Sequence, residues 1–156
     1  MGSGKDTTGL GRWTWTQFHG RNGIVMRVIC AYRPCTPSGV DKIFSVYAQH
    51  QRFFDEQLDD VCPRKAFIRD LFEELDTWIK QGDQAIVALD ANKELRRSEV
   101  ATAFHERNMR EVLLQRDGRN TPPTTDNGSA VINGEYGQHP PLGLSEAATW
   151  QVARHY

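Results

Sequence analysis

The chain has 156 residues, a formal net charge of −1 and 38% hydrophobic residues, which fits one domain with a buried core. No apolar run approaches the roughly 20 residues of a membrane-spanning helix, and the first residues contain no apolar signal-peptide core. The three cysteines form no CxxC pair, which is typical of reduced thiols. We therefore expect an intracellular protein of the cytoplasm or nucleus that is neither secreted nor membrane-bound.

The small net charge conceals an uneven distribution. Residues 1–40 contain five basic residues and one acid, so this segment carries +4 and the remainder carries −5. Two interpretations stay open for the segment: ordinary solvated surface, or a modest basic face that meets phosphates. The basic residues are Lys5, Arg12, Arg21, Arg27 and Arg33.

The first third of the chain predicts a β-hairpin. Residues 1–11 are rich in glycine and polar side chains, so we expect a flexible N-terminus. Alternation at the start of residues 13–18 and a nearly continuous apolar run over residues 24–32 predict two antiparallel strands, the second lying deeper in the sheet. Asn22-Gly23 supplies the turn between them.

Two helices and a strand are expected next. Residues 40–58 show an apolar stripe of helical period. A second helix begins at Pro63, where a first-turn proline belongs, and ends before Gly82, where a C-terminal glycine is preferred. The short apolar run of residues 85–89 predicts a strand that is buried on both faces.

The last part of the chain gives weaker signals. Ser98 can cap a third helix that runs to about Arg107. The order of elements predicts a layered α/β domain over residues 12–136. We expect a short strand at 112–114, a loop at 120–128, a strand at 129–136 and an irregular tail at 137–156.

Polar side chains appear where two apolar strands end. Tyr32 and Arg33 close the strand from residue 24, while Asp90 and Asn92 close the strand from residue 85. Positions i and i+2 of a strand point to one side, so Asp90 and Asn92 would share a face. A carboxylate can take a proton from water beside an orienting amide, and an arginine fork can bind a phosphate. The alternative is that Asp90 and Asn92 simply form turn hydrogen bonds.

Together these motifs resemble the endonuclease/exonuclease/phosphatase superfamily. An apolar strand ending in Ala-Tyr-Arg-Pro, a helix-rich stretch and an apolar strand ending in Asp-x-Asn are most similar to the endonuclease domains of non-LTR retrotransposon polyproteins. The resemblance covers about residues 11–136. It implies part of a DNase I-like four-layer α/β/β/α sandwich, truncated at both ends, and a domain of this kind at residues 12–136.

The resemblance also implies roles for individual residues. Tyr32 matches the tyrosine that contacts the scissile phosphate, Asp90 the aspartate that activates water, and Asn92 its partner. Arg33 and Asn133 are candidate substrate-binding residues, and Asp90 is a candidate metal ligand. The family uses Mg²⁺ or Mn²⁺ to cleave phosphodiesters. DNA or another phosphodiester is the implied substrate, and a reverse transcriptase domain of the same polyprotein is an implied partner.

The chain departs from the family pattern in three places. No segment with an early Asn and a metal-binding Glu precedes the hairpin, and the Ser-Asp-His element is absent, His139 being the nearest candidate. Asn133 stands where the family has an aspartate, and an amide cannot polarise a catalytic histidine. We therefore expect a retroelement-type endonuclease that is incomplete or inactive as this chain.

Three alternatives remain open from the sequence. The first is a non-catalytic remnant that binds nucleic acid or a protein through its hairpin, with Trp13 and Trp15 stacking on bases. The second is a phosphatase of the same superfamily that acts on a small phosphoester. The third is a degenerate reading frame without a selected function.

Overall fold

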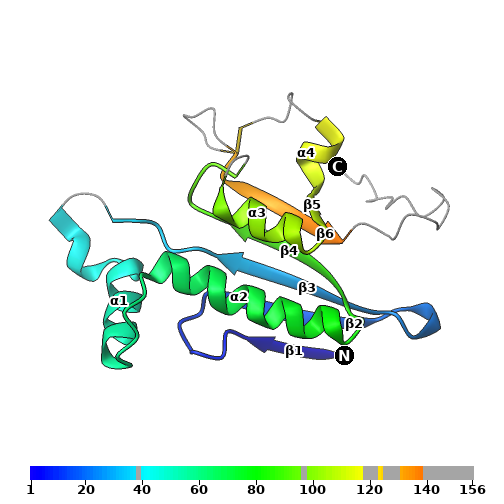
Figure 1. The fold of residues 1–156 in the computed structure, drawn as a ribbon, viewed down its shortest axis with the longest axis horizontal. Coiled ribbons are helices and arrows are strands. Elements are labelled where there is room, and N and C mark those ends of the chain that lie inside the picture. Colours follow the sequence, from blue (N-terminus) through cyan, green and yellow to red (C-terminus); the bar gives the residue numbers. More distant parts are fainter. Residues whose placement is uncertain (38–39, 96–97, 118–122, 125–130, 139–156) are drawn as a thin grey trace.

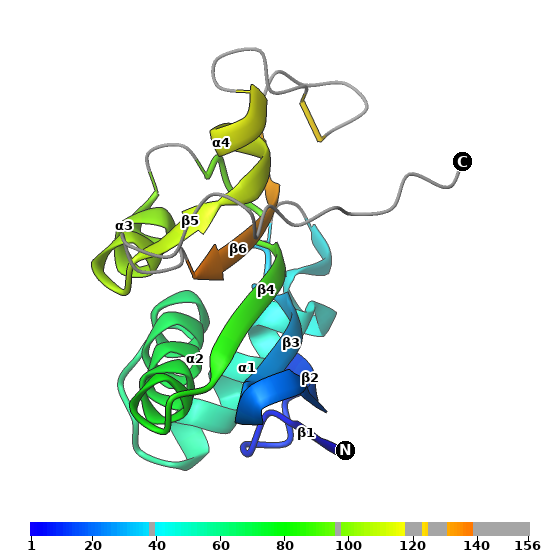
Figure 2. The same cartoon turned by 90° about the vertical axis from the view of Figure 1, so that its right-hand side faces the viewer.

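A computed structural model describes residues 1–37, 40–95, 98–117, 123–124 and 131–138. These residues form a six-stranded mixed sheet in the order β1-β2-β3-β4-β6-β5. Helices α2 and α3 lie side by side over one face of this sheet (Figures 1 and 2). The strands are β1 (Gly2–Lys5), β2 (Trp13–His19), β3 (Val25–Tyr32), β4 (Gln84–Asp90), β5 (Met109–Glu111) and β6 (Asn133–Gln138). The α-helices are α1 (Val46–Glu56), α2 (Pro63–Lys80), α3 (Glu99–Glu106) and α4 (Val112–Asp117).

The predicted hairpin is confirmed. β2 pairs antiparallel with β3 along the whole of β2, from Trp13 opposite Ala31 to His19 opposite Val25. The turn between them is a short 3₁₀ segment, Arg21–Gly23, in which Asn22 and Gly23 take positive φ values of 61° and 75°. β3 lies between β2 and β4 in the sheet, which confirms that the second strand is the deeper one.

The helix predicted from Pro63 is also confirmed, for the expected reasons. Pro63 occupies the first turn of α2, and Gly82 has a φ of 87° just after the helix ends. One face of α2 buries Phe67, Leu71 and Leu75 in the core under the sheet. The Ser98 side chain caps α3 by accepting a hydrogen bond of 3.1 Å from the Ala101 backbone N–H.

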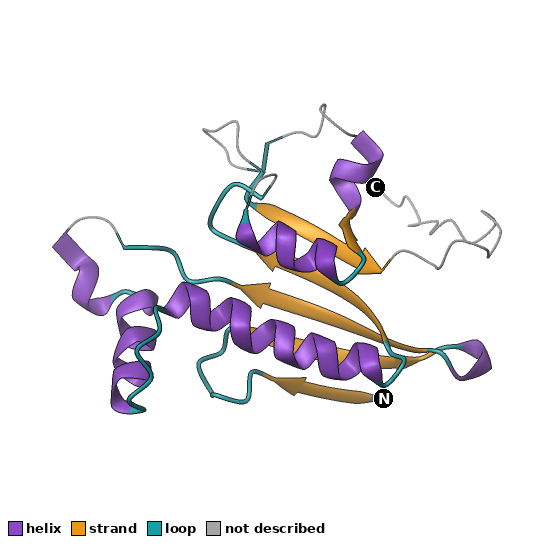
Figure 3. Ribbon diagram, viewed as in Figure 1, coloured by secondary structure: helices purple, strands orange, loops and turns teal. Residues whose placement is uncertain are grey.

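The segment at 40–58 is less regular than its apolar stripe indicates. A 3₁₀ turn, Val40–Phe44, comes first, and α1 then begins after Ser45 (Figure 3). Ser45 ends the 3₁₀ turn and starts the helix, because its side chain accepts a 3.1 Å hydrogen bond from the Ala48 N–H. The stripe therefore predicted helical structure correctly but missed the cap that divides it.

The sheet is buried on one face only, which corrects the prediction for residues 85–89. β4 runs parallel to β3 and alternates between buried and half-buried side chains. Ala85, Val87 and Leu89 lie under the helices, whereas Ile86 and Ala88 point to the other face and stay partly exposed. We call this second side the open face, because each described side chain on it is partly or fully exposed. Its residues are Ser3, Lys5, Thr14, Thr16, Phe18, Met26, Val28, Cys30, Tyr32, Gln84, Ile86, Ala88, Asp90, Arg110, Asn133, Glu135 and Gly137.

The N-terminus is structured, so the prediction of a flexible segment over residues 1–11 is wrong. Gly2–Lys5 forms β1 and pairs antiparallel with β2 at one edge of the sheet. Asp6 follows it, is 1% exposed and binds the buried Arg12 guanidinium through Nε at 2.7 Å. Glycine allows this strand because Gly4 lies against the Trp15 ring, where an added Cβ would come within 2.6 Å of a ring carbon.

The last part of the chain differs from its prediction in one element. The strand expected at 112–114 is the helix α4, and the strand β5 comes directly before it. The final strand exists but covers Asn133–Gln138, a shift of a few residues. Most of the predicted loop at 120–128 and the tail from residue 139 lie outside the described residues. None of the described helices is long and apolar enough to cross a membrane.

Candidate functional site at the strand ends

Three of the candidate residues lie in one row across the sheet. Tyr32 at the end of β3 pairs with Asp90 at the end of β4, and Asp90 pairs with Asn133 at the start of β6. Directly paired residues point to the same face, so all three side chains project from the open face. Neighbouring strands lie about 4.8 Å apart, so the row spans about 10 Å. We call these three residues the strand-end row.

The row is open to solvent. The Tyr32 side chain is 40% exposed, Asn133 is exposed and Asp90 is half-buried. A phenol O–H and an amide N–H can each donate a hydrogen bond to a phosphate oxygen, and a carboxylate can accept a proton from water. The arrangement therefore has the donors and the base that phosphoester chemistry needs, on a surface that a large substrate can reach.

Asn92 lies apart from the row and supports the turn that follows β4. Its φ is 47°, so the strand has ended and the alternation that would place it beside Asp90 no longer applies. Its N–H donates to Asp90 Oδ1 at 3.1 Å, and its Nδ2 donates to the Arg33 carbonyl at 2.8 Å. These contacts match the alternative interpretation of the Asp-x-Asn motif, in which the two side chains form turn hydrogen bonds. They also hold the Asp90 carboxylate in place.

Arg64 is a residue that the sequence did not single out. From the first turn of α2 it donates to two carbonyls, Pro34 O at 2.6 Å and Ala91 O at 3.1 Å. One carbonyl follows β3 and the other follows β4, so Arg64 ties together the segments that carry Tyr32 and Asp90. Burial, and then repulsion by the Arg33 guanidinium, lower the pKa of Arg64. No local pattern predicts this contact, because it depends on where α2 starts relative to the sheet.

The structure does not bring Arg33 to the strand-end row, which corrects the expectation of a phosphate-binding fork. Side chains alternate along an extended chain, so Arg33 points away from the face that carries Tyr32. It is 1% exposed; its Nη2 binds the Glu99 carboxylate and its Nε donates to the Arg64 carbonyl at 3.3 Å. Arg33 thus anchors the N-terminus of α3 to the strand end, and its hydrogen bond lowers the pKa of Glu99.

The described residues do not supply the metal site that the resemblance implies. Asp90 is the one carboxylate in the strand-end row, and the part of the chain that the structure describes holds no group of three His, Cys, Asp or Glu side chains able to bind an ion. Mg²⁺ prefers several oxygen ligands in octahedral geometry. A lone carboxylate beside a phenol and an amide does not fit that requirement.

The tryptophans of the hairpin and its Arg27 make their contacts within the fold. Trp13 is 2% exposed and packs edge-on against Phe67, with ring centroids 6.0 Å apart. The Arg27 guanidinium lies between the Trp15 and Trp78 rings, 4.6 and 4.8 Å from their centroids, and pairs with Asp83 at 2.6 Å. This packing does not match the alternative in which Trp13 and Trp15 stack on bases.

The described residues form neither of the two surfaces considered for the five basic residues of segment 1–40, because most of these residues are buried. Three of them, Arg12, Arg27 and Arg33, are buried and paired with carboxylates. Only Lys5 and Arg21 remain exposed among the five basic residues of this segment. The excess charge of the N-terminal segment is largely neutralised inside the fold by acids from later elements.

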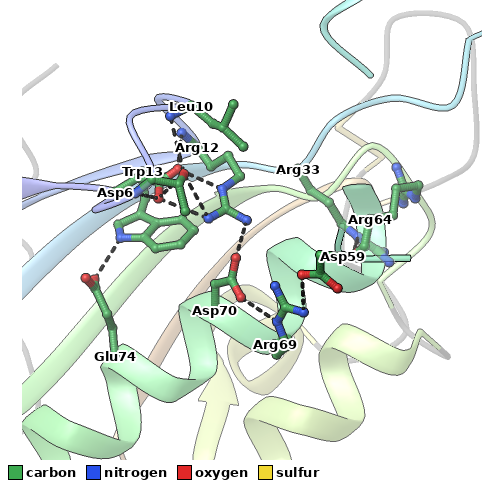
Figure 4. A network of polar contacts seen from close by, with 11 residues as sticks. Asp6, Leu10, Arg12, Trp13, Arg33, Asp59, Arg64, Arg69, Asp70 and Glu74 are labelled. Carbon is green, nitrogen blue, oxygen red and sulfur yellow. Dashed lines mark hydrogen bonds and ion pairs between the residues drawn. The ribbon is translucent and has the colours of Figure 1, made fainter. Parts of the chain in front are cut away.

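A polar network occupies the helix-covered side of the sheet (Figure 4). The Arg12 guanidinium binds Asp6 and also donates to Asp70 on α2 at 2.8 Å, while Trp13 Nε1 donates to Glu74 at 2.8 Å. Burial raises the pKa of Glu74, and the tryptophan hydrogen bond partly offsets that effect. An open hollow of about 570 Å³ lies beside this network, lined in part by Trp13, Asp70 and Glu74. The strand-end row projects from the opposite face.

Comparison with known proteins gives a likeness in structure only. No protein family model and no curated protein matches the sequence. The catalytic domain of human Nocturnin, solved with a bound sulfate anion, superposes with a TM-score of 0.52 at 13% identity and covers 81% of this chain. The match spans 40% of the length of the Nocturnin domain. Beta toxin from Staphylococcus aureus is more distant, with a TM-score of 0.40 at 12% identity over 81% of this chain and 42% of the toxin.

The chain has a DNase I-like α/β fold. This confirms the fold class predicted from the sequence, and the described residues form the sheet and the helices on one of its faces. At 13% identity the likeness concerns the fold alone. The likeness does not bear on origin, substrate or catalytic roles.

Proposed function

We propose that this chain is part of a phosphodiesterase of the endonuclease/exonuclease/phosphatase superfamily that acts on DNA, of the type found in non-LTR retrotransposon polyproteins. The observation that carries the proposal is the common register of Tyr32, Asp90 and Asn133 on the open face. Tyr32 comes from the motif Tyr-Arg-Pro and Asp90 comes from the motif Asp-x-Asn. Position 90 is 58 positions after position 32 in the sequence.

The residues of the row divide the work according to their chemistry. Tyr32 donates its phenol O–H to a non-bridging phosphate oxygen, and Asn133 donates an amide N–H to a second oxygen. Asp90 accepts a proton from the water that attacks phosphorus. The Asn92 N–H donates to Asp90 Oδ1 at 3.1 Å and holds this carboxylate in orientation. Arg64 and Asn92 keep the two strand ends at a fixed separation, which preserves the spacing of the row.

The chain alone is a weak or inactive enzyme in this proposal. The superfamily resemblance implies Mg²⁺ or Mn²⁺, which stabilises the charge of the reacting phosphate, yet the described residues provide a single carboxylate in the row. Activity would need ligands beyond these residues, and a reverse transcriptase domain of the same polyprotein is the partner that the resemblance implies. A flat, exposed row suits a long polymer better than a small phosphoester, which enzymes usually enclose in a pocket.

Titration with a short DNA duplex at low salt, without metal, tests substrate contact independently of turnover. In amide NMR spectra we expect the largest shifts at Tyr32, Asp90, Asn133 and their neighbours. Asp90→Asn should tighten binding several-fold, because it removes a carboxylate that faces the phosphate at about 4–6 Å, worth about 1 kcal/mol in a wet site. Tyr32→Phe should weaken binding, whereas Thr14→Ala, an exposed position on the same face, should leave it unchanged.

Two results would contradict the proposal. Shifts that gather on the hairpin tip or on the helices would place the DNA elsewhere, and weaker binding by Asp90→Asn would remove Asp90 from the phosphate site. Nicking of supercoiled plasmid with Mg²⁺ then measures turnover. Strong nicking that Asp90→Asn abolishes would support the catalytic role and show that the chain is more complete than we propose.

A further inference from the structure

The open hollow beside the polar network has both aromatic and acidic walls. Its lining residues come from α1, from α2, from the start of β2 and from the turn after β1, so it lies between these segments. Its volume of about 570 Å³ falls within the range of ligand-binding pockets. We call it the acidic hollow, and the lining residues that matter most are Trp13, Phe53, Phe54, Asp70, Glu73 and Glu74.

The acidic wall follows from the spacing of carboxylates along α2. Asp70, Glu73 and Glu74 stand at positions i, i+3 and i+4 of the helix, so they share one side of it. Asp70 and Glu74 point the same way from α2 in Figure 4. Glu74 is half-buried and accepts one hydrogen bond, from Trp13 Nε1 at 2.8 Å. Burial raises the pKa of Glu74, which is the behaviour of a carboxylate that no adjacent cation neutralises.

The acidic hollow carries an excess of negative charge. The described residues that line it include four carboxylates and one guanidinium, which gives a formal charge of −3. That guanidinium belongs to Arg69, which already pairs with Asp59 at 2.8 Å and with Asp70 at 2.7 Å. Glu73 and Glu74 form no ion pair within the part of the chain that the structure describes. Their charges are therefore available to a cationic occupant.

Arginines elsewhere in the fold show which cation suits such walls. Arg12 and Arg27 each lie over a tryptophan ring while pairing with a carboxylate. Arg107 lies 4.6 Å from the centroid of the Phe72 ring and binds both oxygens of Asp76, at 2.6 and 2.7 Å. A guanidinium can stack its flat face on a ring and donate from its edge to a carboxylate at the same time. The acidic hollow offers the same two partners.

We propose that the acidic hollow binds an arginine side chain from a basic segment of a partner protein. Phe53, a half-buried ring of the lining, would stack against the guanidinium, and Glu74 would accept its N–H groups. Glu73, at the exposed rim, would attract the other positive charges of the segment. The negative charge of the hollow repels the phosphates of DNA, so a basic protein segment is the matching partner.

This partner and DNA would use different sides of the molecule. The acidic hollow lies on the helix-covered side of the sheet, whereas the strand-end row projects from the opposite face. Binding of the basic segment would therefore leave Tyr32, Asp90 and Asn133 open to solvent. The inference is independent of the proposed function, because none of its residues belongs to the strand-end row.

Titration of the full chain with a blocked pentapeptide, Gly-Arg-Gly-Arg-Gly, tests the site by NMR. The indole N–H of Trp13 donates to Glu74, so its signal reports directly on the hollow and should shift with saturation. The indole signals of Trp15 and Trp78, which hold Arg27, should stay in place as internal controls. A lysine version of the peptide should bind several-fold more weakly, because an ammonium lacks the planar fork. A citrulline version, which has the same shape without the charge, should not bind.

Single substitutions assign the contacts. Glu74→Gln and Glu73→Gln should each weaken binding about fivefold, since each removes one carboxylate from a wet site. Glu106→Gln on α3 is the matched control, because Glu106 is exposed, lies outside the hollow and gives the same change in net charge. Phe53→Leu keeps an apolar side chain but removes the ring, and should weaken the arginine peptide about threefold. Circular dichroism checks that each variant folds, and Glu73→Gln, at an exposed position, keeps the test valid if Glu74→Gln does not.

Three results would overturn the proposal. The first is no saturable shift of the Trp13 indole signal, and the second is equal weakening by Glu106→Gln and Glu73→Gln, which would indicate a general attraction between net charges. The third is equal binding of the lysine and arginine peptides, which would remove the assignment to a guanidinium. The DNA titration reads the strand-end row on the other face, so failure here is distinguishable from failure of the proposed function.

Discussion

Replacement of Arg12 by methionine should destabilise the fold by about 3–5 kcal/mol, the usual cost of breaking a buried ion pair on one side. Both side chains of the Arg12–Asp6 pair are 0% exposed, and the Arg12 Nε and Nη2 atoms donate to the two Asp6 oxygens at 2.7 and 3.0 Å. Without the Arg12 guanidinium, the Asp6 carboxylate keeps the N–H and O–H of Thr8 and the backbone N–H of residue 12, at 3.3 Å, as donors. Asp70, the other acceptor, keeps Arg69 at 2.7 Å.

The size of this effect is large for a domain whose total stability is about 5–15 kcal/mol. Asp6→Asn in the Arg12→Met background removes the stranded charge and should recover about half of the loss. Arg69→Met is the matched control: Arg69 is 47% exposed and pairs with Asp59 and Asp70, so its loss should cost less than about 1 kcal/mol.

Urea unfolding followed by far-ultraviolet circular dichroism is the appropriate assay. Arg12 lies 4.6 Å from the Trp13 ring centroid, so tryptophan fluorescence would change with the substitution itself. All variants should be compared at one protein concentration, because self-association would make apparent stability depend on it. If Arg12→Met costs no more than Arg69→Met, or if Asp6→Asn gives no recovery, the buried pair does not hold the N-terminal segment.

Three further predictions follow from single contacts. Arg64→Ala should cost about 2–4 kcal/mol in urea unfolding, since two carbonyls lose a charged donor, and Arg64→Lys should restore less than half because an ammonium lacks the fork. Burial, and then the Arg12 guanidinium, lower the pKa of His50 in the folded protein. As pH falls, His50 is therefore protonated in the unfolded chain before it is protonated in the folded chain. Stability should therefore fall as pH drops below about 6.5, and His50→Gln should flatten that slope. Gly134→Ala should cost about 1–3 kcal/mol, because its Cβ would come within 2.7 Å of Leu95 Cδ1. Gly137→Ala, with nothing within 4 Å, should change stability by less than about 0.5 kcal/mol.

The pH dependence has a second component at lower pH that is separable from the first. Burial opposes ionisation of Asp6, but hydrogen bonds from Arg12 and Thr8 outweigh it and lower its pKa. The stability that Asp6 contributes is present above its ordinary pKa of 3.8 and is lost as pH falls through the lowered value. The His50 loss begins at higher pH, below about 6.5, so His50→Gln should remove the first component and leave the Asp6 component in place.

Local signals predicted several elements correctly, because each signal acts within a few residues. Pro63 and Gly82 bracket α2 through their own backbone geometry, and Ser98 caps α3 with its own hydroxyl. The hairpin follows from side-chain alternation and the Asn22-Gly23 turn. The motif residues Tyr32 and Asp90 were likewise identified from the apolar strands that they end.

Contacts between distant segments decided the rest. Nothing within residues 1–11 favours a strand over a coil; β1 forms because β2 offers an edge and because Arg12 requires Asp6. The sequence favoured Arg33 as a phosphate-binding residue. Because side chains alternate along the extended chain, Arg33 instead points to the other face of the sheet and binds Glu99 on α3.

The hairpin, α2, β4 and the α/β class were predictable from the sequence, since these depend on local geometry and on hydrophobic period. Three features required the folded arrangement: the partly exposed second face of β4, the neutralisation of three arginines inside the fold, and the row that Asn133 forms with Tyr32 and Asp90. Strand register and burial depend on which segments pack together, and a pattern within one segment cannot contain that information.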